Sequence, residues 1–368
     1  MRPSLGWPTY DPAEAVHDAR VRTGTARQLA SDREAIDVSC KRALITGISG
    51  QDGSFLAELL VDRGYEVFGT VRGDPAGHFE NLSAVRNQIE LVRADLLDEA
   101  SLKRALAECE PDEVYNLASV SFVPASWDEP VLTARFAAVG VTSLLEAIRS
   151  VDPGIRFYQA SSSEIFGAPT TVPQGESTPL APVTPYGVAK AYGHLIVRSY
   201  RLRYGLFACS GIMFNHESWR RPVAFVTRKI AHAAAAISLG LEHKLELGDL
   251  EARRDWGFAG DYVRAMWLMM QQAEPDDYVV ATGQTHSVRE LAEWAFARVG
   301  LEPCDYVDVD ESLKRGPAEL HDLVGDATKA RTLLNWEPSM PLPELIGVMV
   351  DTDLERLRAT HADRGIAC

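Results

Sequence analysis

The chain has few cysteines, fewer basic than acidic residues, and no recognisable targeting segment. Its five cysteines lie far apart, form no CxxC pair and are odd in number: Cys40, Cys109, Cys209, Cys304 and Cys368. This spacing indicates neither a disulfide framework nor a zinc site, so we expect no metal and a reducing, cytoplasmic location. The first forty residues lack an apolar signal core and mix acidic residues with their arginines, unlike a secretory signal or a transit peptide.

The charge balance and the absence of long apolar runs exclude two broad classes of partner. With a formal net charge of -15, the chain lacks the basic surface that neutralises nucleic-acid phosphates, so we expect no nucleic-acid partner. No stretch approaches the roughly 18 uncharged apolar residues of a membrane span, so we expect no membrane association. The 368 residues, 46% apolar and 24% charged, suit a globular protein with one large domain or two moderate ones.

From residue 41 the sequence alternates between strand-like and helix-like patterns. "RALITGI" reads as a buried strand, "SFLAELLVDRG" as an amphipathic helix closed by Gly64, and "YEVFGTV" as a second strand. Further strand-like runs follow at "IELVRAD", "EVYNLAS", "IRFYQASS" and "LFACSGIMF", separated by helical stretches. This order predicts an α/β fold with a doubly wound parallel sheet of the Rossmann type.

The same pattern suggests how the chain divides. We interpret residues 1–40 as an N-terminal extension and residues 41–215 as a dinucleotide-binding domain. After residue 215 the elements become shorter and more mixed, which predicts a smaller α/β substrate lobe over residues 216–368, with some segments returning to the main sheet.

The stretch "TGISGQDG" lies where the first strand gives way to a helix. It places Gly47, Gly50 and Gly53 at a three-residue repeat. Glycines there permit a tight turn and let a pyrophosphate approach the helix N-terminus, whose free N–H groups favour an anion. The context of strand and helix therefore predicts a dinucleotide-binding loop.

The end of the second strand bears on which dinucleotide is bound. It reads "TVRGD", with no acid at the last strand position to bind the ribose hydroxyls of NAD. Arg72 would pair with a 2′-phosphate, so NADP is favoured, while Asp74 keeps NAD as an alternative. Asp95, after the third strand, is predicted either to bind the adenine or to cap the helix that follows.

The pair Tyr186 and Lys190 lies four residues apart in a helix-like stretch and therefore shares one helix face. Tyrosine is a poor base near neutral pH unless a nearby ammonium stabilises its phenolate. Lys190 would supply that ammonium, and Ser162, at the end of a strand, would share the hydrogen bond at the substrate oxygen. Such a site oxidises an alcohol by hydride transfer to the cofactor.

Glu164 adds a function that a simple dehydrogenase does not need. A carboxylate beside a newly formed ketone can remove the acidic proton from the adjacent carbon and return it to a departing hydroxyl. The result is elimination of water. The four residues Ser162, Glu164, Tyr186 and Lys190 are thus our candidate catalytic set.

These motifs resemble the extended short-chain dehydrogenase/reductases, and within them the GDP-mannose 4,6-dehydratase family. The resemblance runs from about residue 41 to about residue 355 and rests on "ALITGISGQDGSFLAELL", "QASSSEIFG", "TPYGVAKAY", "FNHES", "LGDLEARRDWG", "ATGQTHSVRE" and "GDATKA". It implies a hydro-lyase with tightly bound NADP that acts on a nucleotide-diphosphate sugar. Tyr186 would take the proton of the hydroxyl at carbon 4, and Glu164 would assist loss of water across carbons 5 and 6. The stored hydride would then return to carbon 6, giving a 4-keto-6-deoxy sugar.

The resemblance also implies further site residues and an assembly. It assigns to the cofactor, beside the residues already named, Gln51, Asp52, Leu96, Leu117 and Ala118. It assigns to the substrate Ser121, Asn215, Lys229, Arg254 and Glu319, with Arg254 on the diphosphate. Arg220 and Arg221 resemble a basic loop that reaches the cofactor or a neighbouring subunit, although a solvated pair is an alternative. The family resemblance implies a homodimer or a homotetramer.

Several positions depart from the family pattern and leave the substrate open. Ser162 replaces a threonine, Val120 and Phe122 replace polar residues near the sugar, and Trp219 and Pro222 replace a proline and a glycine. The loop after the second strand is also shorter and less basic than in the family. The alternatives are a dTDP- or UDP-hexose 4,6-dehydratase, a UDP-hexuronate decarboxylase, and an NADP-binding regulator without turnover.

Overall fold

The structure is a computed structural model that describes residues 41–314 and 323–363. The chain divides into two units, Met1–Ser39 and Cys40–Cys368, and all described residues lie in the second. The expected extension 1–40 and the predicted substrate residue Glu319 therefore lie outside the described residues. The predicted domain boundary at residue 215 falls inside the second unit, where a short strand begins.

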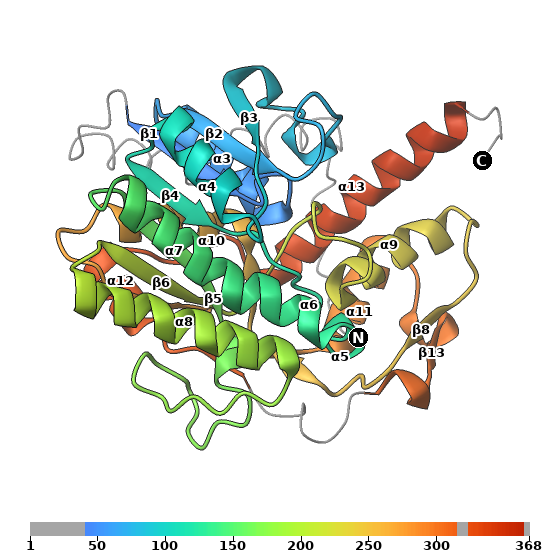
Figure 1. Ribbon diagram of the computed structural model, residues 1–368. Helices are drawn as coiled ribbons and strands as arrows, with labels where there is room; N and C mark the ends of the chain where they lie inside the picture. The colour runs from blue at the N-terminus through green and yellow to red at the C-terminus, as the bar shows by residue number, and fades with distance from the viewer. Residues whose placement is uncertain (1–40, 315–322, 364–368) are drawn as a thin grey trace. The chain divides into compact units, whose positions relative to one another are not determined.

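Seven parallel strands form the main sheet, in the order β11-β6-β5-β4-β1-β2-β3 (Figure 1). Their bounds are β1 Arg42–Thr46, β2 Glu66–Val71, β3 Ile89–Arg93, β4 Glu113–Asn116, β5 Arg156–Ser162, β6 Ala208–Met213 and β11 Asp277–Val280. The strand order reverses between β1 and β4, which opens a crevice at the carboxyl ends of these strands. The predicted doubly wound α/β fold is confirmed, and β11 shows that a segment from beyond residue 215 joins the main sheet.

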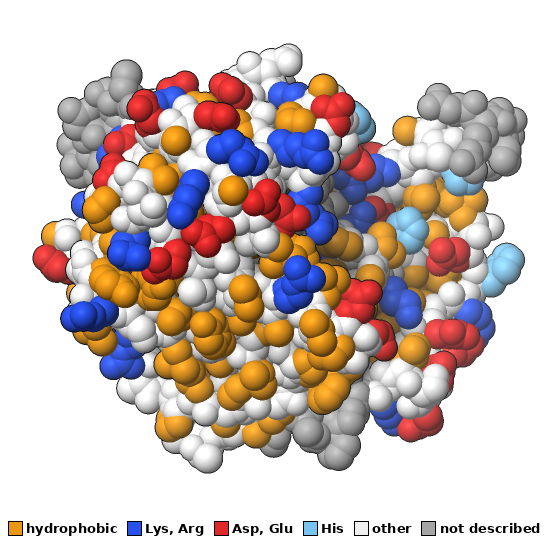
Figure 2. All heavy atoms as spheres, viewed as in Figure 1, with side chains coloured by type: hydrophobic (Ala, Val, Ile, Leu, Met, Phe, Trp, Pro, Cys, Tyr) orange, Lys and Arg blue, Asp and Glu red, His pale blue; other side chains and the backbone are white. Residues whose placement is uncertain are grey.

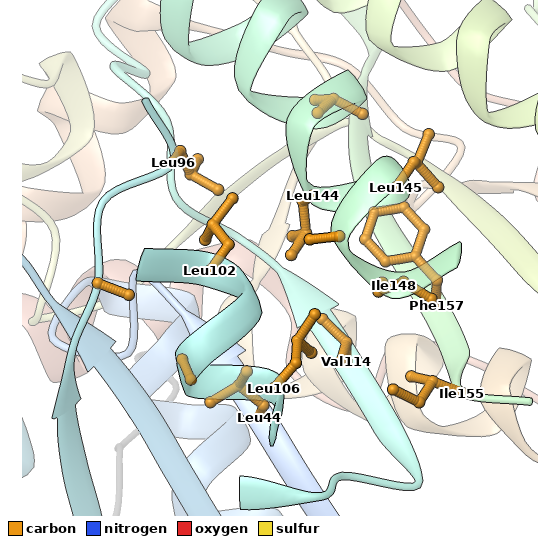
Figure 3. Packing of buried hydrophobic residues seen from close by; sticks show 14 of the residues in the cluster. Leu44, Leu96, Leu102, Leu106, Val114, Leu144, Leu145, Ile148, Ile155 and Phe157 are labelled. Atoms are coloured by element: carbon orange, nitrogen blue, oxygen red, sulfur yellow. The ribbon is translucent and has the colours of Figure 1, made fainter. Parts of the chain in front are cut away.

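Helices cover both faces of this sheet because each strand is connected to the next through a crossover. One face carries α4, α7 and α8, and the other carries α3 and α10. Their bounds are α3 Gln51–Asp62, α4 Glu99–Cys109, α7 Gly140–Val151, α8 Pro185–Tyr204 and α10 Ala259–Met270. Figure 3 shows how leucines of α4 and α7, such as Leu102 and Leu144, pack against Val114 and Phe157 of the sheet. This apolar layer fixes the strand ends from which the site is built.

The helix α8 is held at both ends by local signals in the sequence. The Thr184 side chain accepts a hydrogen bond from the Gly187 backbone N–H at 2.9 Å, and Pro185 occupies the first helical position. Gly205 ends the helix with φ of +67°, in the left-handed region that glycine adopts most easily. Thr184 and Pro185 set the start of the helix, and so they set the position of Tyr186 in its first turn.

The smaller lobe consists of short strand pairs packed on three helices. The helices are α9 Val226–Ser238, α11 Val288–Arg298 and α13 Leu342–Asp363, and α12 Thr328–Leu334 lies beside β11. The strand pairs are β7 Asn215–Glu217 with β10 Trp256–Phe258, β9 Arg253–Arg254 with β12 His286–Ser287, and β8 Leu245–Leu247 with β13 Val307–Val309. A second apolar cluster, which includes Ile230, Trp256, Leu291 and Ile346, forms the core of this lobe.

One helical run in the described part of the chain is long and apolar enough to cross a membrane. It covers Pro130–Val151, where α6 Pro130–Ala134, the π-helical turn η3 Arg135–Val139 and α7 join end to end. More than half of its most apolar window is buried in the protein. The same run packs on α8 and α4, as a core helix does, so it is weak evidence for a membrane span.

Candidate active site

A cavity of about 620 Å³ opens at the crevice between β1 and β4. Most of the residues predicted from the sequence line it: Gly47, Gly50, Gln51, Asp52, Gly53, Arg72, Leu96, Leu117, Ala118, Ser121, Ser162, Glu164, Tyr186, Lys190 and Asn215. These predicted cofactor, catalytic and sugar residues are therefore brought to one space from α3, β5, α8, β7 and the loops that follow β1, β2, β3 and β4.

The glycine-rich turn after β1 lies against the end of β4. Gly47 has φ of +70°, and a Cβ atom there would lie 2.9 Å from the Ala118 backbone. A Cβ on Gly53 would lie 2.4 Å from the Gly47 carbonyl oxygen, so a residue with a side chain at position 53 would force α3 away from the turn. The Thr46 hydroxyl accepts hydrogen bonds from the N–H groups of Leu117 and Ala118, both at 3.1 Å. The result is a backbone cradle at the N-terminus of α3 that fits a dinucleotide pyrophosphate.

The other end of the predicted cofactor site lies at the carboxyl ends of β2 and β3. Arg72 lines the cavity, and its guanidinium carbon lies 5.3 Å from the centre of the Phe136 ring. Ala94 and Leu96 also line the cavity, whereas Asp95 between them does not. Its carboxylate accepts a hydrogen bond from the Leu97 N–H at 2.9 Å. The alternative role of Asp95 as helix cap is wrong, because Asp98 caps α4.

The four candidate catalytic residues come from the end of β5, the short 3-10 turn Ser163–Ile165 that follows it, and the first two turns of α8. The Ser162 hydroxyl accepts a hydrogen bond from the Glu164 N–H at 3.3 Å and also hydrogen-bonds with Tyr186. The Lys190 ammonium lies 5.6 Å from the centre of the Tyr186 ring and donates to the Ala160 carbonyl oxygen at 2.9 Å. A hydroxyl, a phenol, an ammonium and a carboxyl group thus share one cavity.

Burial controls the protonation of this set. Burial raises the pKa of the Tyr186 phenol, and the hydrogen bond with Ser162 and the charge of Arg221 only partly offset the rise. Burial also lowers the pKa of Lys190 to about 8. Burial thus favours the neutral forms of both side chains. A positive charge that a bound cofactor brings near Tyr186 would instead favour the phenolate form of its side chain.

His216 was not assigned to the candidate site from the sequence, although it belongs to the quoted stretch "FNHES". His216 lines the cavity, lies 2.9 Å from the Asp52 carboxylate through Nε2, and hydrogen-bonds the Phe214 carbonyl oxygen through Nδ1. Burial alone would raise the pKa of Asp52 and lower that of His216. Their ion pair outweighs burial, so the pKa of Asp52 falls to about 2 and the pKa of His216 rises.

Arg221 also lines the cavity. Its guanidinium carbon lies 3.7 Å from the centre of the Phe225 ring, and its Nε lies 3.3 Å from the Glu217 carboxylate. Arg220 points away from this space and contacts α3. Neither side chain is exposed, at 14% for Arg221 and 13% for Arg220, so the alternative of a solvated pair is wrong.

Two predicted substrate residues, Lys229 and Arg254, do not line the cavity. The Lys229 ammonium donates to the Glu246 carbonyl oxygen at 2.6 Å, and Arg254 donates to the Arg253 carbonyl oxygen at 2.7 Å. Both belong to the smaller lobe, on α9 and β9. Their assignment to the substrate stays a prediction.

The family model and the curated relatives agree on one family. The family model described as GDP-mannose 4,6 dehydratase matches residues 44–349. The chain is 49% identical over 327 residues to GDP-mannose 4,6 dehydratase 2 of Arabidopsis thaliana, covering 86% of this chain and 87% of that one. It is 44% identical over 343 residues to the human GDP-mannose 4,6 dehydratase, with 86% and 92% covered.

Among solved structures, the fold is similar to UDP-glucose 4-epimerase of Thermus thermophilus in complex with NAD. The TM-score is 0.74 at 28% identity, over 85% of this chain and 98% of that one. The family match extends over more than half of the chain, and it includes every residue of the candidate catalytic set. The chain therefore belongs to the GDP-mannose 4,6-dehydratase family.

Proposed function

We propose that the chain is a hydro-lyase that converts GDP-mannose to GDP-4-keto-6-deoxymannose and water. The observation that carries this proposal is the convergence of Ser162, Glu164, Tyr186 and Lys190 on one cavity beside the glycine-rich turn. Family membership supports the choice of GDP-mannose over other nucleotide sugars.

Each of the four residues has a distinct task in this reaction. A nicotinamide cofactor, held by the glycine-rich turn and Arg72, would supply the hydride chemistry at carbons 4 and 6. Tyr186 accepts the proton of the hydroxyl at carbon 4, with Ser162 hydrogen-bonded to the same oxygen and Lys190 favouring the phenolate. Glu164 removes the proton at carbon 5 and delivers it to the hydroxyl at carbon 6, which leaves as water. Carbon 5 then takes up a proton equivalent to the one that Tyr186 accepted from the hydroxyl at carbon 4, so the sugar loses one molecule of water overall.

We further propose NADP as the cofactor, held through many turnovers. Arg72 supports this preference because it lines the cavity just beyond the last residue of β2, where NAD-binding folds carry an acid. Tight retention follows from the chemistry, since the hydride taken in the first step is needed again in the last.

The assembly we propose is a homodimer that pairs through α8 and the run Pro130–Val151. Apolar side chains gather over these elements in Figure 2. The exposed apolar residues on them are Val131, Val139, Val188, Tyr192, Leu195 and Leu202. Those of α8 follow helical spacing along one outward stripe, and Leu202 is 76% exposed. A stripe of this kind can pair with its own copy across a two-fold axis, which would bury it on both partners.

Turnover of defined sugar nucleotides tests the function. Purified full-length protein is incubated separately with GDP-mannose, dTDP-glucose, UDP-glucose and UDP-glucuronate, and products are identified by mass. We expect loss of water from GDP-mannose alone. Loss of water from another substrate would reassign the substrate, and loss of carbon dioxide from UDP-glucuronate would indicate a decarboxylase. NADP binding without any turnover would indicate a regulator.

A further inference from the structure

Residues 215–221 form a segment that faces two sites at once, and we call it the linking segment. Towards the cavity it presents Asn215, His216 and Arg221. Its remaining side chains include Ser218, Trp219 and Arg220, which contact α3. Because α3 begins at the cofactor cradle, the linking segment touches the predicted cofactor site through α3. Through Asn215 it also belongs to the predicted sugar site.

The contacts of the linking segment with the first turn of α3 are hydrogen bonds. The Ser218 hydroxyl donates to the Gln51 side-chain oxygen at 2.8 Å, and the Gln51 amide donates to the His216 carbonyl oxygen at 3.1 Å. Ser218 and Gln51 are both buried. Together with the ion pair between His216 and Asp52, these bonds join the linking segment to the pyrophosphate cradle itself.

Arg220 and Trp219 hold the next two turns of α3. The Arg220 guanidinium donates to the Ser54 hydroxyl at 3.1 Å and to the Glu58 carboxylate at 2.6 Å, while it lies 4.2 Å over the Phe55 ring. Trp219 packs edge-on against Phe55, with ring centres 5.5 Å apart. Residues 51, 54, 55 and 58 lie on one face of a helix, so the linking segment grips one continuous face of α3.

The linking segment is equally fixed to the smaller lobe. β7, at its start, pairs with β10, and Trp219 stacks on Phe258 at 5.9 Å. The Trp219 carbonyl oxygen accepts hydrogen bonds from Arg228 of α9 at 3.3 Å and Arg356 of α13 at 2.9 Å. Movement of α3 relative to the smaller lobe must therefore break contacts of Trp219 or Arg220.

We propose that Arg220, supported by Trp219, is a positioning residue that couples cofactor binding to nucleotide-sugar binding. The proposal rests on the proposed function, because it takes the cavity as the common site of NADP and GDP-mannose. A pyrophosphate that orders the first turns of α3 also orders the linking segment, and with it Asn215 and Arg221. By linkage, NADP then tightens binding of the sugar nucleotide, and the sugar nucleotide tightens NADP by the same factor.

The test is the ratio of GDP affinities measured by calorimetry on full-length protein with and without saturating NADP. For the unchanged protein we expect GDP to bind at least about 5-fold more tightly with NADP, the lower end of common coupling factors. In Arg220→Ala the ratio should fall to near one, and the KM for GDP-mannose should rise while kcat changes much less. Arg220→Lys should restore part of the ratio, because an ammonium can still reach Glu58 but cannot stack on Phe55 in the same way. If the alanine variant does not fold, the lysine variant decides.

Arg201→Ala is the matched control. Arg201 is as buried as Arg220, at 14% against 13%, and forms a comparable ion pair with Asp277 away from α3. We expect this control to lower the melting temperature without changing the ratio. A ratio near one in the unchanged protein, or an unchanged ratio in both Arg220 variants, overturns the coupling while turnover of GDP-mannose leaves the function standing. Absence of both GDP binding and turnover overturns the function and the coupling together.

Discussion

At the scale of single residues, the acid and base groups of the site divide the reaction into separable steps. In the proposed reaction Tyr186 and Ser162 contact the hydroxyl oxygen on carbon 4, the carbon that is oxidised, whereas Glu164 acts only after a ketone has formed. Substitution of one group should therefore stop the reaction at a defined point.

In Glu164→Gln, oxidation at carbon 4 should survive and loss of water should fall by at least about 100-fold, because an amide cannot carry the proton from carbon 5. Mixing the variant with GDP-mannose should leave reduced cofactor on the protein, seen by its near-ultraviolet absorbance, with little deoxy sugar by mass. Glu344→Gln, at an exposed position of α13, is the control and should behave as the unchanged protein. Normal formation of the deoxy sugar by the Glu164 variant would exclude the assigned role.

Lys190→Met should lower activity by at least about 100-fold yet stabilise the cofactor-free protein at neutral pH. The pKa of Lys190 is about 8 in the folded chain, against 10.5 for a lysine in water, so the unfolded chain binds more protons between these values. The free energy of unfolding of the unchanged protein therefore rises with pH through that window. At pH 7 the variant should gain up to about 2 kcal/mol, after allowing for the lost hydrogen bond to Ala160. Urea unfolding at several pH values checks this, and a gain that does not shrink towards pH 10.5 would contradict the cause.

Arg72→Ala should weaken NADP binding by roughly 10- to 100-fold, the value of a charge-assisted hydrogen bond, and should leave NAD binding nearly unchanged. Calorimetric titration with each cofactor measures both affinities. Arg86→Ala is the control, since Arg86 donates to the Pro75 carbonyl oxygen in the same loop but does not line the cavity. Equal losses for NADP and NAD would count against recognition of the 2′-phosphate.

The sequence was informative about residues whose role depends on local spacing. Tyr186 and Lys190 lie one helical turn apart, and Gly47 and Gly53 flank a turn, so each pair could be predicted from its own segment. The roles of His216 and Arg221 depend on contacts with Asp52, Glu217 and Phe225, and the first of these lies 164 residues away in the chain. No local pattern shows which of these side chains face the cavity.

At the scale of elements, the close contact between α3 and the turn after β1 controls the cofactor site. Gly53→Ala would place a methyl group 2.4 Å from the Gly47 carbonyl oxygen and 2.6 Å from the Ile48 Cα, both backbone atoms that cannot move aside cheaply. We expect α3 to shift, cofactor affinity to fall at least about 10-fold, and stability to drop by about 1–3 kcal/mol. Gly175→Ala, which meets no atom within 4 Å, is the matched control in both binding and thermal unfolding. Unchanged cofactor binding in Gly53→Ala would show that the cradle tolerates a side chain.

The main elements were predictable because their apolar patterns are strong and their ends carry turn residues. The central strands β1, β4 and β5 are buried runs, and α8 has clear caps. The two-residue strands β9 and β12 could not be predicted, because they are defined by pairing between distant segments of the chain. The placement of β11 beside β6 likewise depends on a partner about seventy residues earlier in the chain.

At the scale of the whole molecule, the stripe of exposed apolar side chains on α8 allows the proposed homodimer to be tested. Leu195→Glu should place a charge in the dimer contact and shift the protein towards monomer, as measured by sedimentation at several concentrations. Leu333→Glu is the matched control, because Leu333 is 58% exposed on α12, outside both α8 and the run Pro130–Val151. Identical molecular masses for both variants and the unchanged protein would exclude the proposed contact.

The helix α8 serves both the cavity and the proposed dimer contact, and this limits the substitutions that the sequence can accept. Its 20 residues turn Tyr186 and Lys190 towards the cavity and Val188 and Leu195 outwards. A substitution in α8 that leaves catalysis intact can still disrupt the proposed dimer contact, and a substitution that leaves this contact intact can still impair catalysis. Fewer substitutions should therefore survive selection along α8 than along α4, which lines neither the cavity nor the proposed dimer contact.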